Sequence, residues 1–118
     1  MHKIIDYPFT KLNEYIDAER GGWQKANIIK KNETEVARLN FLGVKVPTPC
    51  RIRFVWHAEN FRRDADNIAF AKKYILDGMV KAGAIPNDNL NHIKGFIDDF
   101  VVDGRDYVEV YAIREDEA

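Results

Sequence analysis

Three aspartates in the middle of the chain have the type and spacing of a metal site. Asp64 and Asp66 are separated by one residue, and Asp88 follows about one helix length later. Two acids at a strand-to-helix junction can both turn inward, and a third that returns from the far end of the helix can close a cage of oxygens. Mg²⁺ suits such a cage because it takes a few carboxylates, keeps several waters and leaves positions for phosphate oxygens. The spacing therefore predicts a Mg²⁺ site, with Mn²⁺ as the alternative ion.

Basic residues accompany these acids in the sequence. Lys73 comes seven positions after Asp66, which places the two side chains about 20° apart around a regular helix. Arg62 and Arg63 directly precede the first acid. Three acids, one helix-borne lysine and two arginines are the composition of a metal-dependent phosphodiesterase site.

Each of these residues also has a structural interpretation. Aspartate is frequent at helix N-caps and in turns, so Asp64 and Asp66 could cap the helix that starts near Asn67. Asp88, within a Pro-Asn-Asp-Asn sequence, could be a turn residue. Lys73 could be an ordinary solvated helix lysine. Taken singly, the four residues leave the two interpretations open.

Strands at both ends of the chain and helices between them must position this site. The pattern predicts an edge strand at 3–9. It also predicts one helix at 10–20, with Thr10 as its N-cap, and a second helix at 23–40. A strand at 50–59 and a helix at 67–82, ended by Gly83 as the C′ residue, come next. Strands at 92–103 and 107–115 then follow, joined by a hairpin-type connection. This order predicts one α+β domain over residues 1–118 with a small mixed β-sheet.

Composition excludes several classes of protein. The 118 residues contain no serine, which excludes a serine nucleophile, and a single cysteine, which excludes internal disulfides and Cys-rich zinc sites. No apolar run approaches the roughly 20 residues of a membrane span, and the N-terminus lacks the apolar stretch of a signal peptide. We therefore expect a cytoplasmic protein with no membrane partner.

The net charge of −1 hides an asymmetry along the chain. Residues 1–81 hold fifteen basic and ten acidic side chains, a charge of +5, while residues 82–118 hold three and nine, a charge of −6. One part of the chain could therefore face a polyanion while another repels it.

Residues 62–89 resemble the RusA family of Holliday junction resolvases, especially members from phages and prophages of low-GC Gram-positive bacteria. The family pattern is a D-x-D-N motif, a helix with a lysine four residues before an aspartate, a glycine turn, and an acid eleven residues beyond that aspartate. In this chain the pattern falls on Asp64, Asp66, Asn67, Lys73, Asp77, Gly78, Met79, Gly83 and Asp88. The segment between the D-x-D-N motif and the lysine is three residues longer than in the shorter enterobacterial members. Asn87 stands where many members have a second acid.

The resemblance implies a homodimeric, Mg²⁺-dependent endodeoxyribonuclease with a RusA-like fold. Such an enzyme resolves four-way DNA junctions by paired nicks during recombination and repair, inside a bacterial or phage-infected cell. By this resemblance Asp64, Asp66 and Asp88 would bind the metal and, with Lys73, make up the catalytic set. Basic side chains would bind the DNA phosphates: Arg62, Arg63, Lys72, Lys25, Lys30 and Lys31.

Two other functions fit the same sequence. The first is a non-catalytic DNA-binding or junction-binding protein whose acidic cluster is structural, which would bind DNA in EDTA and cut nothing. The second is a scaffold or dimerisation protein, which would show no salt-dependent DNA binding at all.

Overall fold

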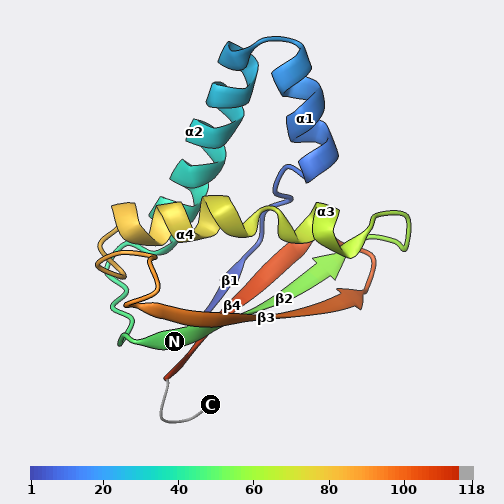
Figure 1. The fold of residues 1–118 in the computed structure, drawn as a ribbon. Helices are drawn as coiled ribbons and strands as arrows, with labels where there is room; N and C mark the ends of the chain where they lie inside the picture. Colours follow the sequence, from blue (N-terminus) through green and yellow to red (C-terminus); the bar gives the residue numbers. More distant parts are fainter. Residues whose placement is uncertain (115–118) are drawn as a thin grey trace.

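The computed structural model describes residues 1–114 as an α+β fold, with one mixed β-sheet covered by helices on one face (Figure 1). The strands are β1 (His2–Ile5), β2 (Cys50–Ala58), β3 (Ile93–Val102) and β4 (Tyr107–Arg114). Their order in the sheet is β1-β4-β2-β3, with β3 parallel to β2 and the other neighbours antiparallel. The predicted fold class is thus confirmed. Residue 115, predicted to end the last strand, lies outside the described residues.

Alternation of side chains along β2 and β4 builds the core. Ile52, Phe54 and Trp56 point to the helical side of the sheet, and Val108 and Val110 of the neighbouring strand lie beside them. All five are buried, because α4 (Lys72–Lys81) lies across this face of the sheet (Figure 1). The period of two that predicted a half-buried strand at 50–59 is therefore realised in the packing.

The predicted hairpin between the last two strands is wrong. Strand β2 lies between β3 and β4, so the connection at 103–106 passes over the end of β2 instead of joining neighbours. The Asp103 N–H donates to the Ala58 carbonyl, 3.1 Å away, and anchors this crossing. Four residues suffice, since crossing one strand requires about 10 Å and an extended residue spans about 3.3 Å. Turn residues alone could not distinguish this crossing from a hairpin.

The helix predicted at 67–82 is divided. It forms α3 (Ala65–Ala69) and α4, with Phe70 and Ala71 between them. The predicted end is confirmed. Gly83 has a positive φ of 76°, and the N–H groups of Gly83 and Ala84 donate to Val80 and Met79 as in a Schellman cap.

A helical hairpin stands away from the sheet (Figure 1). It consists of α1 (Leu12–Arg20) and α2 (Trp23–Asn40). Thr10 does not cap α1, because its backbone N–H and its hydroxyl both donate to the buried Glu33 carboxylate of α2. None of the helices within residues 1–114 combines the length and apolar character that a membrane span requires.

Candidate functional site

An open groove of about 480 Å³ lies where α3 and α4 face the edge strand β3. Its charged lining comes from three elements: Asp66 from α3, Lys72 from α4 and Asp98 from β3. The remaining lining is apolar and consists of Leu12, Ala65, Ala69, Phe70 and Phe100. Two carboxylates and an ammonium group in one accessible hollow form a polar site with both signs of charge.

Asp98 and Lys72 form the fixed part of this groove. The Lys72 Nζ donates to Asp98 Oδ2 at 2.7 Å, and Trp56 Nε1 donates to Asp98 Oδ1 at 2.8 Å. The ammonium group also lies over the Phe96 ring, 4.5 Å from its centroid, in a cation–π contact. Both oxygens of Asp98 and the Lys72 head group are therefore held in place before any ligand arrives.

Lys73, the lysine that the sequence placed on the Asp66 face, is not among the groove residues. Its side chain is 57% exposed, and its Nζ lies 3.2 Å from Asp77 of the same helix. The expectation of a regular helix fails here. Hydrogen bonds of the i to i−3 type run from the N–H groups of Ala71, Lys73 and Tyr74.

These bonds wind the chain more tightly than an α-helix. A 3₁₀ turn advances about 120° per residue instead of about 100°. Six residues after Asp66, this extra rotation brings Lys72 toward the face that Lys73 would occupy in a regular helix. In line with this rotation, Lys72 and not Lys73 lines the groove with Asp66.

Asp64 and Asp66 have exposed carboxylates without a hydrogen-bond or ion-pair partner in the described part of the chain. Asp64 holds the N-cap position of α3, with extended backbone angles of −76° and 151°, but its side chain forms no cap hydrogen bond. The structural interpretation of Asp64 as a helix cap is therefore not realised.

Asp88 lies far from the other two predicted ligands. It sits in the loop that joins α4 to β3, whereas Asp64 and Asp66 begin the helical layer at its other end (Figure 1). At about 1.5 Å per residue, the span from Ala65 to Lys81 covers about 24 Å. Within residues 1–114 no three His, Cys, Asp or Glu side chains come close enough to hold a metal. The predicted three-acid cage is thus not formed within one chain.

The two arginines before the first acid differ in their surroundings. The Arg62 side chain is exposed, and no partner for its guanidinium exists within the described residues. Arg63 Nη1 lies 3.6 Å from Asp106, a carboxylate that also accepts from Lys11 and from the Glu59 N–H. Arg62 is consequently the freer of the two to bind a phosphate.

The three lysines of α2 are exposed but do not form one line. At about 100° per residue, Lys30 lies about 140° and Lys31 about 240° around the axis from Lys25. A continuous helix over 23–40 therefore spreads the predicted phosphate contacts around its circumference.

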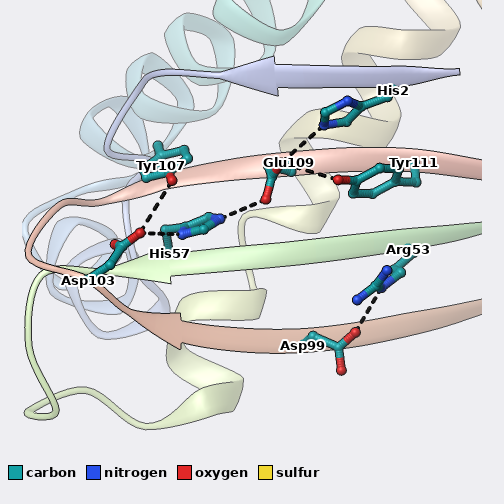
Figure 2. A network of polar contacts seen from close by, with 8 residues as sticks. All are labelled: His2, Arg53, His57, Asp99, Asp103, Tyr107, Glu109 and Tyr111. Carbon is teal, nitrogen blue, oxygen red and sulfur yellow. Dashed lines mark hydrogen bonds and ion pairs between the residues drawn. The ribbon is translucent and has the colours of Figure 1, made fainter.

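A second polar cluster occupies the other face of the sheet (Figure 2). His57 Nδ1 contacts Asp103 at 2.7 Å, and its Nε2 contacts Glu109 at 2.8 Å. Tyr107 stacks on the imidazole at a centroid distance of 3.9 Å. The His57 hydrogen bond holds the pKa of the Glu109 carboxyl below its usual value. Both ring nitrogens of His57 have hydrogen-bond partners, so neither nitrogen is left to act as a base. The cluster instead links β2 and β4 to the turn at 103–106.

Asp98 was not among the site residues predicted from the sequence. Its signal was available in strand 92–103, where Phe96, Asp98 and Phe100 alternate on the face that packs under the helices. A carboxylate among aromatic residues on such a face requires a hydrogen-bonding or charged partner.

Neither the comparison with models of protein families nor the search of curated proteins returned a match to this chain.

Proposed function

We propose that this chain is a Mg²⁺-dependent endodeoxyribonuclease that cuts branched DNA, with the four-way junction as its main substrate. The observation that carries the proposal is the joint presence of Asp66, Lys72 and Asp98 in one open groove. The resemblance to RusA resolvases supports the choice of substrate.

The donor set suits the proposed ion. The groove offers carboxylate oxygens from Asp66 and Asp98, with the unpaired Asp64 carboxylate two residues from Asp66. Mg²⁺ is commonly held by one or two carboxylates with several waters, and it requires no His or Cys ligand. When bound, the ion supplies Lewis-acid activation of a water and of the scissile phosphate.

The protein side chains supply orientation and charge. Asp66 and Asp98 would hold the ion, while the pre-positioned Lys72 ammonium would stabilise negative charge that builds on the phosphate. The unpartnered Arg62 would bind a neighbouring phosphate. Lys73, the catalytic lysine expected from the sequence, would then be a surface residue outside the groove.

The predicted homodimer would allow Asp88 to contribute to the metal site. Because Asp88 lies at the far end of α4 from Asp66, it can complete the site only when a second copy brings it to the groove. Two such sites in one symmetric assembly would nick two strands of a junction.

The simplest test incubates the purified protein with a labelled four-way junction and a linear duplex, each in Mg²⁺ or in EDTA. We expect nicking of the junction in Mg²⁺ alone, and a loss of about 100-fold or more for Asp66→Asn with junction affinity unchanged or higher. Absence of Mg²⁺-dependent cleavage would contradict the proposal.

A complementation test examines the dimer. Asp66→Asn and Asp88→Asn chains, each inactive alone, are coexpressed with different tags. Random pairing of the two chains makes half of the dimers mixed. If Asp66 and Asp88 of different copies share a site, each mixed dimer contains one intact site. We therefore expect about a quarter of wild-type nicking. Continued inactivity of the purified mixed dimer would mean that the sites do not combine in this way, and full activity of Asp88→Asn alone would remove Asp88 from the site.

The second candidate function is a junction-binding protein without catalysis. The Lys72–Asp98 ion pair, with Trp56 on the other oxygen, is the observation that favours it, because such a closed set can be purely structural. Junction binding in EDTA without cleavage in Mg²⁺ or Mn²⁺ would support this alternative.

A further inference from the structure

Phe61 is the most exposed large hydrophobic residue in the described part of the chain, with 88% of its surface accessible. It lies in the loop 59–64 between β2 and α3, which projects beyond the helical layer at one end of the molecule (Figure 1). A phenylalanine in this position contributes almost nothing to the core. Its ring is therefore accessible to a molecule outside the chain.

The loop that carries Phe61 is held on both sides. Its first residue donates its backbone N–H to Asp106 Oδ1 at 2.8 Å, and Arg63 approaches the same carboxylate. Between them, the Asn60 side chain accepts the Arg62 N–H at 2.9 Å and closes a local turn. Phe61 therefore lies on a turn that is held in place by hydrogen bonds and by the contact of Arg63 with Asp106.

The surroundings of Phe61 indicate the chemistry of its partner. In the sequence it follows Glu59 and Asn60 and precedes Arg62 and Arg63, so its chain neighbours on both sides are polar. Protein docking sites usually present a contiguous apolar patch. An aromatic ring beside cationic side chains is instead the arrangement that binds nucleic acids, where the ring stacks on a base and the cations bind the backbone.

We propose that Phe61 stacks on an unpaired or unstacked base at the branch point of DNA, while Arg62 binds the adjacent phosphate. The proposal rests on the proposed function and names what selects branched DNA over linear duplex. A continuous duplex covers both faces of every internal base, whereas a branch point exposes base faces. Phe61 follows β2 three residues before Asp64, so a base held there lies next to the acids that begin α3.

The experiment measures binding to a fluorescent four-way junction and to a linear duplex of the same length in EDTA, where cleavage is absent. Phe61→Ala is expected to weaken junction binding about tenfold, the usual effect of losing one base–aromatic stack. Its duplex affinity should change less than about twofold, because no stack forms there. Phe61→Trp should retain junction affinity, whereas Phe61→Leu, which keeps an apolar side chain without a π face, should behave as Phe61→Ala.

Leu42→Ala is the matched control, since Leu42 is also an exposed apolar residue of a turn, 52% accessible, and lies after α2. Equal junction affinities for Phe61→Ala and the control, in a protein that cleaves junctions, would overturn this proposal alone. Wild-type protein that binds no junction in EDTA and cuts none in Mg²⁺ would overturn both proposals. Retained affinity in Phe61→Leu would show a general apolar contact and would exclude stacking.

Discussion

At the scale of single residues, the winding of the backbone between α3 and α4 decides which lysine lines the groove. Asp66, Lys72 and Asp98 meet because the helix winds tightly between Ile68 and Tyr74, and Lys73 instead turns toward Asp77. The side-chain types and the D-x-D spacing could be read from the sequence. The 3₁₀ bonds could not, because no proline or glycine marks them.

The Lys72 assignment predicts opposite results at neighbouring positions. Lys72→Ala should lower the single-turnover cleavage rate about 100-fold, since it removes a fixed charge that faces the phosphate. Lys73→Ala should cleave at close to the wild-type rate. The thermal midpoint of each variant serves as the control, because Lys72 also pairs with Asp98. A larger loss in Lys73→Ala would return the catalytic role to Lys73.

At the scale of elements, α4 rests on α2 through a glycine. A Cβ atom on Gly78 would lie 2.5 Å from the Ala37 Cβ and 2.7 Å from the Arg38 nitrogen. The backbones of the two helices therefore touch at this point, and the position of α4, with Lys72 at its start, depends on the contact. The sequence shows the glycine within a helical pattern but not the helix that packs against it.

Gly78→Ala should consequently destabilise the protein. Overpacking against backbone costs about 3 kcal/mol, which exceeds the roughly 1 kcal/mol that alanine gains in a helix. The free energy of unfolding should fall by about 2 kcal/mol, as measured by urea denaturation. Gly21→Ala is the control, because its new Cβ would meet chiefly the flexible Lys25 side chain, at 3.2 Å. Equal stabilities of the two variants would contradict the close contact.

The boundaries of the helices and strands were largely predictable from the sequence, but the pairing of the strands was not. Apolar periodicity located β2 and α2, and Gly83 marked the end of α4. The partner of β4 depends on which side of β2 the chain passes, and the turn at 103–106 carries no signal for this choice.

At the scale of the whole molecule, one carboxylate ties three distant segments together. Asp106 accepts from Lys11, whose side chain is only 9% exposed, and from the Glu59 N–H, and it lies near Arg63. Burial alone would raise the pKa of Asp106, but these hydrogen bonds and charges lower it overall. The ionised form is therefore the one that stabilises the fold.

The sign of this pKa shift sets the pH dependence. The stabilisation is complete above the ordinary aspartate pKa of about 3.9 and is lost as the pH falls through the lower folded-state value. Asp106→Asn should reduce the free energy of unfolding at pH 7 by about 3 kcal/mol, because it leaves the buried Lys11 charge unpaired. The difference from wild type should shrink below about pH 4. Asp6→Asn, at the exposed Arg105 pair, should change nothing measurable, and an equal loss there would contradict this account.

The pairing of β1 with β4 affects how the protein is made. His2 lies opposite Tyr111, so the edge strand formed by the first residues has no partner until the last strand exists. Strand β2 likewise lacks its two neighbours until residues 93–114 are present. During synthesis, a chain emerging from the ribosome can form α1 and α2 early, but its sheet must wait until residues 93–114 have been made. Folding should therefore proceed slowly for a domain of this size, since its strand pairs are distant in sequence.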